Sequence, residues 1–186
     1  MNFNSHSQLL GRHAFLSPSN YHWINYSEQR LAERYTTARA AQKGTELHAF
    51  AHEAIRLGIQ LPAITETLNM YVNDAIMYHM QVEQALYFSD NCFGHADTLS
   101  FDHGLLRIHD LKTGVIPSSV QQLLVYAALF CLEYIISPHE IELELRIYQS
   151  NEVSCYDPYP ESIVRIMDKI VLFDQRIEEI KEVGAW

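Results

Sequence analysis

Apolar and polar side chains alternate along three segments of the chain, residues 96–101, 105–112 and 140–148. Side chains two residues apart on a strand point to the same side, so this alternation predicts three half-buried β-strands. A short run at residues 85–89 predicts one further strand before them. The pattern therefore indicates a sheet of about four strands.

Other segments repeat their apolar positions with helical spacing. Ile64, Leu68, Tyr71 and Ala75 form one stripe, which predicts a helix over residues 62–79. Caps and further stripes predict the remaining helices: residues 19–41 with a bend near Tyr26, residues 45–57 behind Thr45, a helix from Ser118 or Ser119 to just before Pro138, and residues 160–183. Helices and strands alternate along the 186 residues, which indicates an α/β fold in a single domain.

A tight turn joins the two strands at residues 96–101 and 105–112, because Gly104 can adopt a positive φ. If the turn is centred between His103 and Gly104, the apolar residues of the two strands face one another. A slip of one residue would turn one apolar set away from the other, so the match supports this register. The expected opposite pairs are Phe101 with Leu106, Leu99 with Ile108, and Asp97 with Asp110.

This register places Asp97, Asp110 and Lys112 together at the far end of an otherwise apolar face. Hard divalent cations such as Mg²⁺ prefer oxygen ligands and keep several waters, so two carboxylates and a main-chain carbonyl can hold one. A lysine beside them could orient a water or stabilise developing negative charge. The spacing of Asp110 and Lys112 alone would suit a surface salt bridge; the arrival of Asp97 on the same face favours a metal site.

Five fragments in order resemble the PD-(D/E)xK nuclease superfamily, in its RecB-like exonuclease branch, and within it a phage family known only as a domain of unknown function. They are residues 13–25 as an opening motif, Gly44-Thr45-Glu46-Leu47-His48, Gly94-His95-Ala96-Asp97, Asp110-Leu111-Lys112-Thr113-Gly114, and Gln122-Leu123-Leu124-Val125-Tyr126. Residues 145–149 resemble the strand that follows. The resemblance implies a restriction-endonuclease-like core, with a central mixed sheet flanked by helices. It places a helical N-terminal segment at 1–43, an αβββαβ catalytic core at 44–150 and a C-terminal helix at 151–186.

The resemblance also implies residue roles. Asp97 and Asp110 would be catalytic metal ligands, with the Leu111 carbonyl and His48 completing the shell, and Lys112 would be the catalytic lysine. Gln122 and Tyr126 lie one helical turn apart and would brace the site and contact the substrate backbone. The implied activity is a deoxyribonuclease dependent on Mg²⁺ or Mn²⁺, an exonuclease in phage DNA recombination or processing.

Two other functions share these residues and stay open. The first is a DNA-end or protein-binding module with weak or no catalysis, and the second is a structure-specific endonuclease. The implied partners are DNA and either further copies of the chain or a single-strand-annealing recombination partner. His52 follows His48 by four residues, but the order His-x-x-x-His-Glu does not match a zinc protease, so His52 is interpreted as structural. Glu83 is interpreted as a surface residue.

The net charge of −10 is unusual for a protein that binds nucleic acid. Its distribution is uneven: residues 1–43 carry five basic side chains, Arg12 among them, and two acidic ones, and the remaining residues carry a net −13. Arg30 and Arg34 share a helix face, and this stripe is either a DNA contact or a solvated surface. DNA binding is therefore expected to be weak and salt-sensitive.

The three cysteines are scattered and form no metal-ligand spacing. They are too few for a Cys₄ iron–sulfur cluster, so no such cluster is expected. No apolar run approaches membrane-spanning length and no signal-peptide pattern opens the sequence. We therefore expect no membrane association and a cytoplasmic location, in the host cytoplasm if the chain is phage-encoded.

Overall fold

The computed structural model describes residues 5–9, 11 and 13–184, so Arg12 and the last two residues of the expected C-terminal segment lie outside the described residues. The chain divides into two compact units, Met1–Lys43 and Gly44–Trp186.

The N-terminal unit begins with two 3₁₀ helices, Ser7–Leu9 and Pro18–Asn25. Tyr26 then adopts an extended conformation, which produces the expected bend, and helix α1 begins at Glu28. The indole Nε1 of Trp23 donates a hydrogen bond of 3.0 Å to the Ser17 carbonyl and so closes this first segment on itself.

Helix α1 runs without interruption over Glu28–Arg56, which corrects the prediction of two helices separated near residues 42–44. The residues before the expected break, 38–43, are alanine-rich and otherwise long-chained, and such residues favour a helix strongly enough to carry it through Gly44. Thr45 is therefore an interior helical residue and not a cap. The expected end is confirmed, because Gly58 turns the chain with a φ of +65°.

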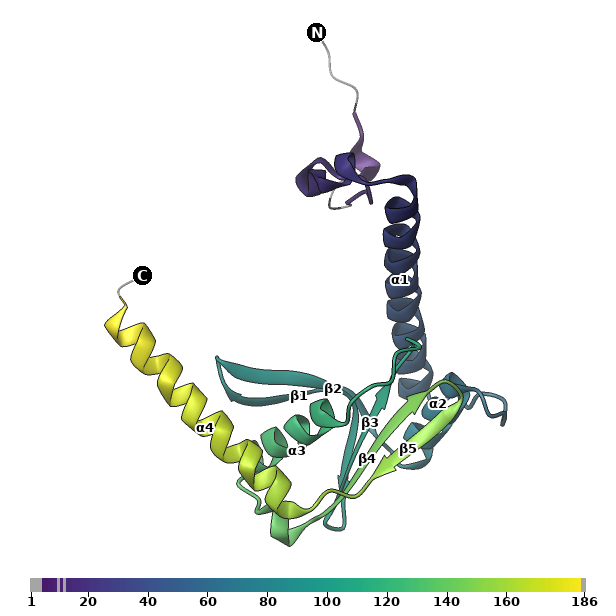
Figure 1. Ribbon diagram of the computed structural model, residues 1–186. Coiled ribbons are helices and arrows are strands. Elements are labelled where there is room, and N and C mark those ends of the chain that lie inside the picture. The colour runs from purple at the N-terminus through teal and green to yellow at the C-terminus, as the bar shows by residue number, and fades with distance from the viewer. Residues whose placement is uncertain (1–4, 10, 12, 185–186) are drawn as a thin grey trace. The chain divides into compact units, whose positions relative to one another are not determined.

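Five strands form one sheet in the order β1-β2-β3-β4-β5, where four were expected (Figure 1). They span Gln81–Ser89, Cys92–Asp102, Leu105–Leu111, Glu142–Gln149 and Glu152–Tyr156. Only β3 and β4 pair in parallel, so the sheet is mixed. The additional strand β5 follows a turn in which Ser150 and Asn151 both have positive φ, and it is mostly exposed, so no apolar alternation announces it.

The β2–β3 hairpin has the predicted register. Phe101 lies opposite Leu106 and Leu99 opposite Ile108. His103 and Gly104 both have positive φ, 49° and 80°, as a two-residue turn of this hand requires. The register therefore confirms the pairing on which the predicted carboxylate site depends.

Helices cover both faces of the sheet (Figure 1). Helices α3 (Gln121–Tyr134) and α4 (Pro160–Val183) pack on one face over Leu106, Ile108 and Leu145. The end of α1 and helix α2 (Thr67–Met77) pack on the other face over Leu111 and Tyr148. No helix within the described residues is both long and apolar enough to cross a membrane.

The helix predicted over residues 160–183 is confirmed as α4, but the segment 151–186, expected to be a C-terminal helix, also contains β5. Helix α2 begins five residues after the predicted Pro62. The segment before it is fixed by side chains instead: Asn69 Nδ2 donates to the Pro62 carbonyl, and Asn73 bonds both the amide and the carbonyl of Leu61. Asparagine side chains commonly compete with helical hydrogen bonds in this way.

A polar network lies in the core on the face covered by α1 and α2, between α2 and strands β3 and β4. The Tyr148 hydroxyl is 2.6 Å from Asp74 Oδ2 and 3.3 Å from His109 Nδ1, and Arg146 donates to the same Asp74 oxygen at 2.9 Å. His109 is fully buried. Burial, reinforced by Arg146 and Arg107, lowers the pKa of His109 to about 3, so the imidazole is neutral near pH 7.

This burial makes stability depend on pH in a defined direction. The unfolded chain protonates His109 near pH 6.5 while the folded chain does not, so lowering the pH from about 6.5 towards 3 favours unfolding by up to about 1.4 kcal/mol per pH unit. His109→Asn, which keeps a group at the Nδ1 position, should unfold with a shallower pH dependence in urea titrations between pH 6.5 and 4. Equal slopes in the two proteins would contradict this interpretation.

Candidate functional site

Asp97 and Asp110 meet where the β2–β3 ladder ends. The last pair of that ladder is Thr98 with His109, and the same register continued by one residue brings the two aspartates opposite each other. Asp97 Oδ2 accepts a hydrogen bond of 3.2 Å from the Leu111 amide, so the Leu111 main chain lies beside the carboxylates. The structure thus brings together the three residues predicted on this hairpin as metal ligands.

Asp110 is almost fully buried, and its partner is Lys112. The Lys112 Nζ lies 3.0 Å from Oδ1 and 2.9 Å from Oδ2 of Asp110. Oδ2 nevertheless has no hydrogen bond with good geometry among the described residues. Burial is the main effect on Asp110 and raises the pKa of its carboxyl; the hydrogen bond from Lys112 acts against it, and the charge of Asp97 adds to it. The site therefore holds a carboxylate whose charge is only partly compensated.

His48 approaches these carboxylates from α1. Its Nδ1 is 3.5 Å from Asp97 Oδ2, and its side chain is 29% exposed. One turn earlier on the helix, Gly44 faces Thr113, which follows Lys112. A Cβ on Gly44 would lie 2.7 Å from Thr113 Oγ1, so the absence of a side chain lets the helix approach the loop after β3.

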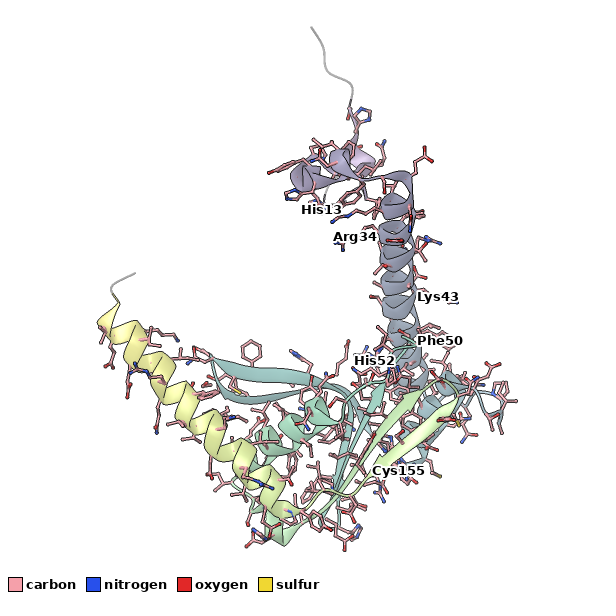
Figure 2. All side chains as sticks on the ribbon, in the orientation of Figure 1. His13, Arg34, Lys43, Phe50, His52 and Cys155 are labelled. Atoms are coloured by element: carbon pink, nitrogen blue, oxygen red, sulfur yellow. The ribbon has the colours of Figure 1, made fainter. Side chains whose placement is uncertain are left out.

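His52, predicted to be structural, also lies in this region, and it contacts Glu83, which is predicted to be a surface residue and is 57% exposed. His48, His52 and Asp97 offer ligand atoms within 4.8 Å of one another. His52 is buried near the end of α1 (Figure 2), and its Nδ1 lies 3.3 Å from Glu83 Oε1. The spacing of four residues between the histidines was a usable signal, whereas the position of Glu83 depends on the β1–β2 register, which the sequence did not reveal.

Gln122 and Tyr126 brace the site from α3. Gln122 Oε1 accepts a hydrogen bond of 3.0 Å from Lys112 Nζ, and its amide donates to the Tyr126 hydroxyl at 3.4 Å. Tyr126 in turn donates to the His95 carbonyl at 2.6 Å. Gly94 permits this approach, because a Cβ there would lie 3.0 Å from the Tyr126 ring. Lys112 is therefore held between a carboxylate and an amide.

Arg30 and Arg34, the predicted basic stripe, belong to the N-terminal unit. Within that unit they line one pocket together with Asn20, His22, Asn25 and Tyr26. The Arg30 guanidinium lies 5.0 Å from the centre of the Tyr26 ring. The two arginines do share a face, as their spacing predicts.

The donor set around Asp97 suits a divalent cation. The two carboxylates carry more negative charge than the single ammonium of Lys112 can balance, and one of them has a buried oxygen without a hydrogen bond. The imidazole of His48 adds a nitrogen donor. Oxygen ligands accommodate Mg²⁺ or Mn²⁺, and an imidazole shifts the preference towards transition metals. No protein-family model matches the chain, and neither does any curated protein or solved structure to which it was compared.

The close approach of α1 to the loop after β3 gives a test by substitution. Gly44→Ala should lower the free energy of unfolding by about 1–3 kcal/mol through overpacking against Thr113, despite the better helix propensity of alanine. Thr113→Ala in the same chain removes the colliding oxygen and should restore stability, which a double-mutant cycle of urea unfolding would measure. Additive effects of the two changes would show that the helix and loop do not touch here.

Proposed function

We propose that the chain is a metal-dependent deoxyribonuclease of the PD-(D/E)xK type, in the RecB-like branch, and that it acts as an exonuclease in phage DNA recombination or processing. The order of the elements supports this proposal: one helix carrying His48, three strands carrying Asp97 and Asp110, a helix carrying Gln122 and Tyr126, and a strand parallel to β3. The observation that carries it is the placement of Lys112 Nζ between Asp110 and Gln122.

In this proposal Asp97, Asp110, His48 and the Leu111 carbonyl hold a Mg²⁺ or Mn²⁺ ion. When bound, the ion would stabilise the phosphate as a Lewis acid and would lower the pKa of a water enough for it to become a nucleophile near neutral pH. The chain contributes the negative charge that attracts the ion, because Asp110 is a buried acid beside a second carboxylate. Metal binding is thus expected to weaken at acid pH, where the raised pKa of Asp110 favours its protonated form.

Lys112 then has a part distinct from metal binding. Its ammonium group, fixed by Asp110 and Gln122, can orient the attacking water or stabilise the negative charge that develops on the phosphate. Tyr126 fixes Gln122 and anchors α3 to the main chain at His95. Gln122 and Tyr126 are only partly covered, so they can also contact a substrate backbone.

The negative charge of residues 44–186 suits a DNA substrate that binds chiefly through the proposed metal ion. Residues 44–186 are strongly acidic overall, and the basic residues Arg30 and Arg34 of the N-terminal unit offer the additional phosphate contacts in this proposal. Binding is then dependent on metal and steeply reduced by salt. A further copy of the chain or a recombination partner could supply more positive charge.

The direct test is digestion of end-labelled single-stranded and duplex linear DNA and of closed circles, with Mg²⁺, Mn²⁺ or chelator. We expect metal-dependent loss of linear DNA that spares circles. Asp110→Asn should abolish cleavage, and Lys112→Ala should reduce it by about 10²–10⁴-fold. The matched controls are Asp168→Asn and Lys169→Ala on the exposed side of α4, which should cleave like the unaltered chain.

The other outcomes assign the alternatives. Cleavage of closed circles would make the protein an endonuclease with the same centre. Binding of DNA by the folded protein without cleavage of any substrate would overturn the nuclease proposal in favour of a binding module. Cleavage that survives both Asp110→Asn and Lys112→Ala would refute the assigned site.

A further inference from the structure

An apolar pocket lies beside the loop that follows β3. It has a volume of about 240 Å³, and its apolar lining residues are Leu47, Leu68, Leu111 and Val115. Thr67, Thr113 and Ser150 add hydroxyl groups to the lining. Concave apolar surfaces that carry a few polar groups are the usual form of a binding site for an organic ring, and this one is smaller than the pockets of about 300–1,000 Å³ that hold drug-sized ligands. We call it the Val115 pocket.

The Val115 pocket is continuous with the candidate site. Lys112 lines it, and the ammonium group of the same side chain contacts Asp110. Leu47 directly precedes His48 on α1, and Leu111 lines the pocket while its carbonyl is a proposed metal ligand. A phosphate bound at the proposed metal ion is therefore next to the pocket.

One side chain at the end of β4 holds the loop that forms the outer wall of the pocket. Gln149 Nε2 donates hydrogen bonds of 2.6 and 2.8 Å to the carbonyls of Gly114 and Ile116. Its Oε1 accepts a hydrogen bond of 3.1 Å from the Ser118 amide. The loop is thus fixed, although Val115 is 88% exposed. An apolar side chain on a loop that is already ordered can contact a ligand without a further ordering cost.

Gly114, in the same loop, is required neither by its backbone nor by its packing. Its φ lies outside the left-handed region, and a Cβ there would meet no atom within 4 Å. Gly44 and Gly94 differ, because a Cβ would meet a neighbour at 2.7 and 3.0 Å respectively. The use of glycine that is left for Gly114 is to let a ligand approach the main chain closely. The open space at this residue therefore suits a bound group.

We infer that the Val115 pocket holds one nucleobase of the DNA strand, from a nucleotide that flanks the phosphate at the proposed metal ion. This inference rests on the proposed function for the class of ligand. The apolar lining covers the faces of the base, which all four bases share, so the contact is tolerant of sequence. A base is uncharged, so it can add affinity in a unit, residues 44–186, whose net charge of −13 repels the phosphates around it.

The test uses short single-stranded oligonucleotides in which an abasic site replaces one base at a time. Affinity for the full-length chain is measured by fluorescence anisotropy with Ca²⁺ in place of Mg²⁺, and cleavage is measured separately with Mg²⁺. We expect an abasic site at one position, counted from the end, to weaken binding by about tenfold, because the apolar pocket then stays in contact with water. Abasic sites at the other positions should have little effect.

Two variants change the pocket and leave the proposed metal ligands unaltered. Gly114→Leu fills the open space and should weaken binding of intact DNA by about tenfold, and Val115→Ser removes part of the apolar wall and should weaken it by about threefold. In both variants the abasic site should cost less affinity than in the unaltered chain. The matched control is Ile116→Ser, since Ile116 is apolar and 80% exposed but does not line the pocket. It should bind like the unaltered chain.

Binding that depends on no single base, or that loses the same affinity to the abasic site in Gly114→Leu as in the unaltered chain, would overturn the inference. Equal losses in Ile116→Ser and Val115→Ser would overturn it as well, and so would a chain that binds no DNA. Failure of the nuclease proposal appears separately, as absent cleavage. Binding that depends on one base and on Gly114, in a chain that cleaves no DNA, would support the inference and refute only the proposed function.

Discussion

The candidate site is organised around the Asp110 carboxylate, which is buried beside a second carboxylate. Removing a charge from water is costly unless it is paired, and here burial raises the pKa of Asp110 although Lys112 donates to it. The surrounding elements hold this arrangement in place. Strand β3 is central in the sheet: Asp110 pairs with Ile147 of β4, and the residue before it, His109, pairs with Thr98 of β2.

The two hydrophobic cores lie on opposite faces of this strand, and each positions a different helix beside the site. On one side, Leu106 and Ile108 pack under α3, which delivers Gln122 to Lys112. On the other side, Leu111 packs with Tyr148 against α1 and α2, and α1 delivers His48 and His52. Because neighbouring residues of a strand point to opposite faces, His109 anchors the second core while Asp110 remains available to the site. His48, His52 and Asp97 thereby bring ligand atoms within 4.8 Å of one another between helix and sheet.

The sequence was most informative where one face of an element is buried. The pairing of Leu99 with Ile108 could be predicted because a shifted register would expose one apolar set, and α4 could be bounded from Pro160 because proline favours the first helical turn. The motif at Gly44-Thr45 was misinterpreted as a helix start because the need for Gly44 is tertiary: it admits Thr113. Strand β5, exposed and carrying little apolar pattern, could not be predicted.

The same reasoning explains what was missed at the site. Asp97, Asp110 and Lys112 are neighbours in one hairpin, so local register predicted their meeting. His52 and Glu83 come together through the packing of α1 on β1, and the left-handed φ of Glu83 has no signature in its residue type. Long-range packing and strain at a polar residue are properties of the folded chain that periodicity does not encode.

The most direct measurement is the thermal stability of the unaltered chain and of Asp110→Asn at pH 8, each in chelator and in Mn²⁺. Because the pKa of Asp110 is raised by folding, its charged form weakens the metal-free protein above that pKa, so in chelator the asparagine variant should be the more stable of the two. Mn²⁺ should reverse the order, since binding to the folded state stabilises it by about 2.7 kcal/mol at a concentration one hundred times Kd. A variant that is less stable in chelator, with no response of the unaltered chain to Mn²⁺, would contradict the account.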